Sequence, residues 1–232
     1  MLSDALLIAR KDLLIERRSK VLTTQLLPFG MIVLILFGFG LSPDRRVATG
    51  DGEGRAVLAQ VSPGLFWLAV FFSALLAFSR AFAIEAGDGN LDALRLTGLD
   101  PAGIFLGKAT AIAVELFVVD LVLGAGSFLL YAPELSHPLL LAVTVVSTTL
   151  AVALAGTLYA ALASGMRVRD TLVPLLSLPA LSPVLLGASI ATEAALFGPS
   201  SDGWAWAGLL GAFALLYLGA GILAFGRVLE EA

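Results

Sequence analysis

Two acidic residues, Glu115 and Asp120, lie in the middle of a long apolar stretch and are the first candidates for chemistry. Ionisable side chains at membrane depth are costly, so they usually face a cavity or a partner. A spacing of five residues is about 500° of helix rotation, which leaves the two side chains about 140° apart. We therefore expect different neighbours for each, such as a cavity and an adjoining subunit. Their use is either ion-coupled transport or packing, with hydrogen bonds to hydroxyls of the next span: Thr144, Ser147, Thr148 or Thr149.

The polar link at residues 85–99 is the second candidate, because its pattern is typical of a short amphipathic helix. Gly87 and Gly89 end the preceding apolar segment, and Asp88 or Asn90 can cap a new helix. Three leucines then offer an apolar face, which suits insertion into a groove of a partner protein. The alternative is a helix that lies along the membrane surface. The residues assigned to partner contact are Glu85, Asp88, Gly89, Leu91, Asp92, Leu94 and Arg95.

Several kinds of site are excluded by residue type. The chain has no cysteine, which rules out disulfides, thiolate metal sites and cysteine nucleophiles. Because His137 is the single histidine, we expect neither a protein-only metal site nor a cofactor bound by this chain. Residues 102–110, AGIFLGKAT, approach a phosphate-binding loop, but Ala102 replaces its first glycine and Ala109 its Ser or Thr. Any ATPase must therefore be a separate protein, and this chain is expected not to be an enzyme.

The elements that position these residues are transmembrane helices. Hydrophobic residues make up 59% and charged residues 14% of the chain, whereas charged residues are about 25% of a soluble protein. Apolar segments of about twenty residues match the roughly 30 Å hydrocarbon core of a bilayer. We predict an all-α, polytopic membrane protein with a single transmembrane domain at 1–232. Its six spans are predicted at 22–41, 63–84, 103–131, 138–163, 171–192 and 204–226.

The fifth span contains Pro174, Pro179 and Pro183, each of which removes a backbone donor. The span is expected to be kinked or divided into two half-helices, with hydroxyl groups or neighbouring helices completing the hydrogen bonds. Broken helices line transport pathways in some carriers, and a purely structural kink is an equal alternative.

Residues 1–21 are predicted to form a basic amphipathic helix, either at the membrane surface or as a plain lead-in to the first span. Of the 14 basic residues, eleven flank links on the N-terminal side of the membrane and three flank the other side. Both termini are therefore predicted to face the cytoplasm. The link at 42–62 is predicted to be a mobile, solvated loop. Three tryptophans are predicted to anchor helices at the membrane interface: Trp67, Trp204 and Trp206.

Three segments give the sequence a specific likeness: SPGLFW at 62–67, DGNLDALRL at 88–96 and MRVRDTLVPLLSLPALSPVLLGAS at 166–189. Together with the basic N-terminal helix and the six spans, they resemble the haem exporter protein B family (CcmB). This family is the permease subunit of an ABC transporter in bacterial cytochrome c maturation. The resemblance covers nearly the whole chain, and it implies an ABC-2 (type V exporter-like) permease with residues 85–99 as its coupling helix.

The resemblance also implies partners and a location. It predicts a homodimer in the bacterial inner membrane, with a CcmA-like ATPase, CcmC-like and CcmD-like membrane proteins and a CcmE-like haem chaperone. ATP would bind the partner ATPase, haem would be the cargo or stay on the chaperone, and no nucleic acid is involved. Two other functions stay open: an ABC-2 exporter of a lipid-linked, polysaccharide or drug-like substrate, and an ion-coupled carrier that uses Glu115 and Asp120.

Overall fold

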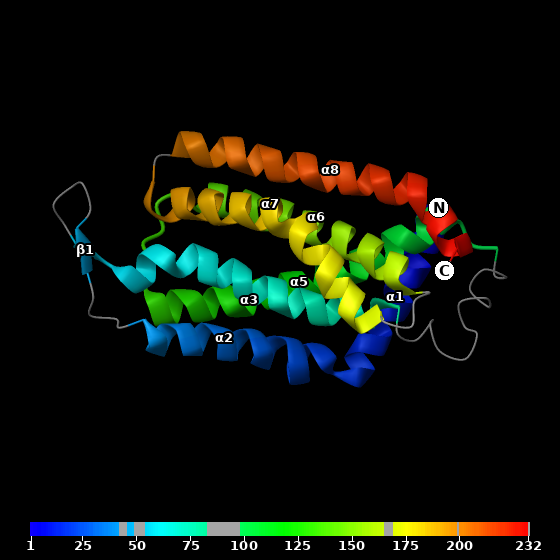
Figure 1. Cartoon of the computed structure of the whole chain (residues 1–232), viewed down its shortest axis with the longest axis horizontal. Helices are drawn as coiled ribbons and strands as arrows, with labels where there is room; N and C mark the ends of the chain where they lie inside the picture. Colours follow the sequence, from blue (N-terminus) through cyan, green and yellow to red (C-terminus); the bar gives the residue numbers. More distant parts are fainter. Residues whose placement is uncertain (42–45, 49–53, 83–97, 165–168, 199, 232) are drawn as a thin grey trace.

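The structure is a computed structural model that describes residues 1–41, 46–48, 54–82, 98–164, 169–198 and 200–231. Its elements carry the labels of Figure 1. They are α1 (Leu2–Ser19), the π-helical turn η1 (Leu22–Leu26), α2 (Leu27–Gly40), β1 (Arg46–Ala48), β2 (Gly54–Ala56), α3 (Val57–Ala81), α5 (Pro101–Tyr131), α6 (Pro138–Ser164), α7 (Arg169–Phe197) and α8 (Ser200–Glu231).

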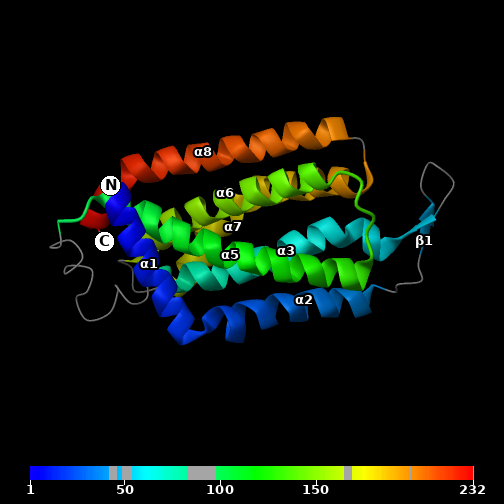
Figure 2. The same ribbon diagram turned by 180° about the vertical axis from the view of Figure 1, so that it is seen from behind.

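Six helical segments of the described chain are long and apolar enough to cross a membrane, as the sequence predicts. They are Leu22–Gly40, Val57–Ala81, Pro101–Tyr131, Pro138–Ser164, Thr171–Phe197 and Ser201–Arg227. The protein is therefore an all-α, polytopic membrane protein with one small β ribbon. In Figures 1 and 2 the long helices run side by side, with the ribbon at one end and both termini at the other. We call these the ribbon end and the terminal end.

The link at 42–62 is not the plain loop that its glycines and charges predict. Strands β1 and β2 pair antiparallel in the register Arg46↔Ala56, Val47↔Arg55 and Ala48↔Gly54. Helix α3 follows directly at Val57, which is six residues before the predicted start of the second span. The rest of this link lies outside the described residues.

The early start of α3 depends on how Pro63 is accommodated. Pro63 lies inside the helix and cannot donate to the carbonyl of Ala59, four residues earlier. The Ser62 hydroxyl donates to that carbonyl instead, at 2.7 Å. The missing backbone bond is thereby replaced within the same turn, and the helix continues through the proline.

In α7, too, a serine hydroxyl replaces a backbone donor that proline lacks, and the helix is continuous over Arg169–Phe197. Pro183 leaves the carbonyl of Pro179 without its backbone donor, and the Ser182 hydroxyl donates to it at 2.9 Å. The prediction of two half-helices is therefore wrong, whereas Figure 1 shows a bend along the helix. Pro179 and Pro183 both lie on an exposed face.

Two glycines allow large, buried aromatic rings to pack against helix backbones in the half of the bundle nearer the terminal end. Phe78 of α3 lies against Gly156 of α6, where an added Cβ would be 2.0 Å from the ring. Phe105 of α5 lies against Gly221 of α8, where the same distance is 2.0 Å. Both rings are buried. These small residues allow close packing of the helices, which matters in a membrane because lipid provides little hydrophobic driving force for helix association.

Helix α1 crosses α5 near the terminal end (Figure 2). Glycine makes this crossing close, because a Cβ at Gly107 would lie 2.6 Å from the Cβ of Ile8. Asp4 accepts a hydrogen bond from the backbone N–H of Asp100 at 3.3 Å, which lowers the pKa of the Asp4 carboxyl. The outer face of α1 has the composition that the predicted membrane-surface helix requires: its exposed residues include Leu2, Leu6, Leu7, Arg10, Leu14, Arg17 and Arg18.

Candidate functional site

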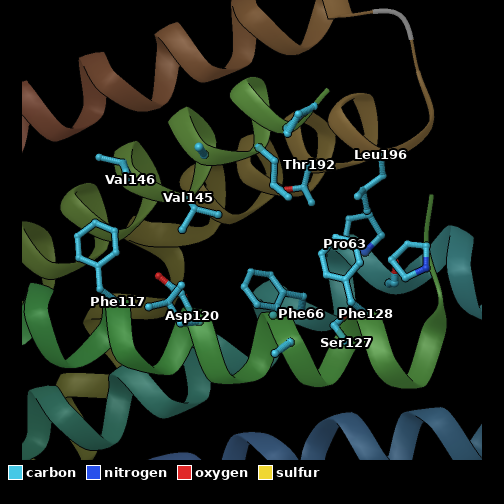
Figure 3. A pocket seen from close by; sticks show the side chains of 18 residues that line it. Pro63, Phe66, Phe117, Asp120, Ser127, Phe128, Val145, Val146, Thr192 and Leu196 are labelled. Atoms are coloured by element: carbon cyan, nitrogen blue, oxygen red, sulfur yellow. The ribbon is translucent and has the colours of Figure 1, made fainter. Parts of the chain in front are cut away.

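A cleft of about 440 Å³ lies among α3, α5, α6 and α7, in the half of the bundle nearer the ribbon end. Its position follows from its lining, which includes Pro63 near the start of α3, Pro133 between α5 and α6, and Leu196 near the end of α7. Most of the lining is aromatic or aliphatic (Figure 3). We call this cavity the Asp120 cleft, because Asp120 is its one acidic lining residue.

Asp120 rises from α5 between Phe117 and Phe66 and points toward α6 (Figure 3). Its side chain is 4% exposed, and the Thr149 hydroxyl of α6 donates to Oδ2 at 2.5 Å. This bond confirms the predicted contact between an acid of the third span and a hydroxyl of the fourth. The other carboxyl oxygen, Oδ1, is buried and has no hydrogen-bond partner among the described residues.

Two of the other polar side chains at the cleft have hydrogen-bond partners within the protein. Thr192 of α7 accepts a hydrogen bond from Nε1 of Trp67 at 2.8 Å, and Ser62 bonds the carbonyl of Ala59. Trp67 is 1% exposed, so the prediction that it anchors the interface is wrong: its indole N–H finds a buried acceptor on the adjoining helix instead. Trp204 is exposed near the start of α8, as an interface anchor requires.

The Asp120 cleft opens sideways, through the surface of the helix bundle. Leu121 on α5 is 73% exposed and Val146 on α6 is 45% exposed, and both line the cleft. In a bundle whose helices cross a membrane, such exposed apolar side chains face lipid. The cleft therefore links the buried carboxyl to the apolar outer surface of the bundle.

A second, smaller cavity of about 170 Å³ lies at the terminal end, between α1, η1, α3 and α5. It is lined by Lys108 of α5, whose side chain is 1% exposed. The ammonium donates to Asp12 of α1 at 3.2 Å and to the carbonyl of Ala81 at 2.6 Å, and it lies 4.6 Å from the ring centre of Phe82. One cation thus joins α1 and α5 to the C-terminal end of α3, where helix carbonyls favour positive charge. We call this set the Lys108 cluster.

Glu115 lines the cavity of the Lys108 cluster, together with Glu16 of α1 and Arg80 of α3. Arg80 donates to the side-chain oxygen of Gln25 at 3.0 Å, and Glu16 accepts from the backbone N–H of Leu22. Glu115 and Asp120 therefore line two different cavities, as their angular separation predicts. The structure does not bring the two acids into one site.

The remaining predicted site residues are placed as follows. The proposed coupling contacts from Glu85 to Arg95 lie outside the described residues, so the coupling helix stays a prediction. The prolines of α7 do not line the Asp120 cleft, to which this helix contributes Thr192 and Leu196. A pathway along the proline face is therefore not supported by the position of this cleft.

Sequence reasoning missed the Lys108 cluster, because it counted Lys108 among the basic residues that flank a link. One signal was available: Lys108 lies seven residues beyond Pro101, the first residue of α5, and therefore inside a predicted span. A cation at that position requires an acidic partner nearby. The partner, Asp12, follows Ile8 by four residues on the face of α1 that packs on α5, and this packing is seen only in the structure.

The profile of the CcmB protein family matches residues 3–231. This chain belongs to the CcmB family. Three CcmB relatives carry the name "Heme exporter protein B". The protein of Rhodobacter capsulatus is 34% identical over 162 residues, which is 69% of each chain. That of Haemophilus influenzae is 30% identical over 188 residues, 81% of this chain and 80% of the relative. That of Pseudomonas aeruginosa is 33% identical over 222 residues, 91% of this chain and 90% of the relative.

Proposed function

We propose that this chain is the permease subunit of an ABC transporter for cytochrome c biogenesis. ATP hydrolysis on a partner subunit would drive haem export or the release of a haem-loaded chaperone. The observation that carries the proposal is the match to the CcmB family over residues 3–231, with relatives named for haem export. In this proposal the chain is a non-catalytic homodimer subunit of the bacterial inner membrane. Its terminal end faces the cytoplasm, and CcmA-like, CcmC-like, CcmD-like and CcmE-like proteins are its partners.

The Lys108 cluster supports this proposal, because it lies at the terminal end, next to the segment that would transmit movement of the ATPase to the permease. The proposed coupling helix lies between Ala81, the last residue of α3, and Pro101, the first residue of α5. Lys108 bonds the carbonyl of Ala81 from α5 and also holds Asp12 of α1. A movement of the coupling helix would therefore be transmitted to α1, α3 and α5 together, as a rigid-body shift.

The positions of the two acids argue against the ion-coupled carrier. Such a carrier would use Glu115 and Asp120 as one ion or proton relay, yet they line separate cavities in opposite halves of the bundle. An ABC-2 exporter of another substrate would share the fold and the ATPase, so a cytochrome c phenotype distinguishes it from the proposal.

Purification of the tagged chain from its native membranes in mild detergent tests the proposal directly. We expect an ATPase and a Trp-rich haem-handling membrane protein to co-purify, identified by mass spectrometry. An ATPase without the haem-handling protein would favour a general ABC exporter. The absence of any ATPase would contradict the proposal.

Leu91→Asp is expected to lower affinity for the ATPase by about tenfold or more, because it places a charge in the apolar contact of the coupling helix. Leu94→Asp should have the same effect. The measurements are ATPase co-purification and the yield of haem-loaded chaperone. Leu91→Met keeps the apolar contact and is the matched control. Unchanged binding and yield in both aspartate variants would remove residues 85–99 from the ATPase contact.

A further inference from the structure

The unpaired oxygen of Asp120 is an acceptor of hydrogen bonds. A hydroxyl has one hydrogen, and the Oγ of Thr149 lies 2.5 Å from Oδ2 of Asp120 and 2.7 Å from the carbonyl of Val145. If that hydrogen goes to Oδ2, Asp120 is either a carboxylate or an acid with its proton on Oδ1, and the acid form leaves a buried O–H without an acceptor. If it goes to Val145, then Oδ2 carries the proton and donates to Thr149. In the two arrangements that leave no buried hydrogen unpaired, Oδ1 has free lone pairs and no hydrogen.

A buried acceptor without a partner is costly, so Oδ1 favours a ligand that brings a donor. An ammonium group suits this oxygen best, because a hydrogen bond between a cation and a carboxyl oxygen is stronger than a neutral one. A carboxylate ligand would place acceptor against acceptor. The remaining lining is mostly apolar, with Phe66, Phe117 and Phe128 among its members. Oδ1 therefore recognises the head group and apolar contacts hold the body of the ligand, while the hydroxyl of Ser127 is a further polar group of the lining.

The size of the Asp120 cleft fits a small molecule. Its volume of about 440 Å³ lies within the range of roughly 300–1,000 Å³ that is usual for such sites. A 10 Å length of a helix 10 Å across occupies about 800 Å³, so a transmembrane helix of a partner would not fit. The exposed rim at Leu121 and Val146 gives a route from the apolar part of the membrane.

We propose that the Asp120 cleft binds a small amphiphile with an apolar body and an ammonium head, which enters sideways from the bilayer and donates to Oδ1 of Asp120. This inference goes beyond haem export and does not depend on it. It assigns a ligand chemistry to a cavity that the family match leaves undescribed.

Photolabelling with two matched probes tests the proposal. The full chain is placed in phosphatidylcholine nanodiscs, because the head group of this lipid carries no N–H donor. The probes are 4-(aminomethyl)benzophenone and 4-benzoylbenzoic acid, which share an apolar body and differ in the head group. We expect adducts of the amine on Leu121, Val146 and Leu196, mapped by mass spectrometry, at about tenfold the level of the acid.

Asp120→Leu should reduce labelling by the amine to the level seen with the acid. The fold should persist, because the Thr149 hydroxyl can still donate to the carbonyl of Val145. Glu193→Leu is the matched control: it removes an exposed acid next to Thr192 on α7 and should leave labelling unchanged. Equal labelling by both probes in the parent chain would overturn the proposal without any variant. Amine adducts that persist in Asp120→Leu, or that lie only outside the cleft, would overturn it as well.

Discussion

Lys108→Met is expected to lower the free energy of unfolding by about 2–3 kcal/mol, because it breaks a buried, hydrogen-bonded ion pair. Methionine keeps the length and apolar volume of the stem, so the change isolates the ammonium. The carbonyl of Ala81 loses its 2.6 Å donor, and Asp12 loses the partner that holds α1 on α5. The measurement is the unfolding free energy in mixed micelles titrated with SDS.

Lys11→Met is the matched control for this prediction. Lys11 also contacts Asp12, at 3.2 Å, but its side chain is 40% exposed. Exposed ion pairs contribute about 1 kcal/mol or less, so the control should be much milder. Equal losses in the two variants would show that burial of Lys108 has no special role.

If the coupling proposal also holds, Lys108→Met retains the ATPase in purification yet yields less haem-loaded chaperone.

Gly156→Ala is expected to cost about 3 kcal/mol or more and to reduce the amount of folded protein sharply, because the added methyl overlaps a buried ring. The new Cβ would lie 2.0–2.5 Å from three ring atoms of Phe78. That ring is 1% exposed, so it has little room to move. Yield after size-exclusion chromatography and SDS unfolding measure the effect.

Gly208→Ala is the matched control, because a Cβ at Gly208 would meet no described atom within 4 Å. It should be neutral or stabilising by up to about 1 kcal/mol, since alanine favours helix over glycine. Adding Phe78→Leu to Gly156→Ala removes the ring atoms that clash and should restore part of the lost stability. Equal effects of alanine at Gly156 and Gly208, or no recovery in the double variant, would contradict the proposed packing.

Hydropathy and helix geometry predicted what depends on local sequence. Each of the six predicted spans has a matching helix, and the separation of Glu115 from Asp120 follows from 3.6 residues per turn. The partner of Asp120 was also among the predicted hydroxyls, because adjacent spans are expected to pack together. The proposed partner contacts from Glu85 to Arg95 cannot be judged in the same way, since all of them lie outside the described residues.

The wrong predictions concern residues whose hydrogen-bond partner is distant in the sequence or of an unexpected kind, so that rules based on local sequence do not apply. Proline was expected to begin the second span, but the hydroxyl of Ser62 replaces its lost backbone donor and the helix begins six residues earlier. In the fifth span the predicted hydroxyl compensation is present at Ser182, and only the alternative of two half-helices is wrong. Trp67 was assigned to the interface, because its partner Thr192 is 125 residues away in sequence. Lys108 was counted as a link residue for the same reason. A single sequence contains no direct information on such long-range contacts.

The pairing of Lys108 with Asp12 has a consequence for biogenesis. The two residues are 96 positions apart, so α1 is synthesised long before α5. A lysine that enters the bilayer alone opposes insertion, by up to about 2.5–3.5 kcal/mol near the centre and less toward the ends. When α5 reaches the translocon, Asp12 is already present at the membrane surface to receive the cation. The N-terminal helix would then act as an internal insertion aid, and a chain lacking it would be defective in integration of its third span before any question of transport arises.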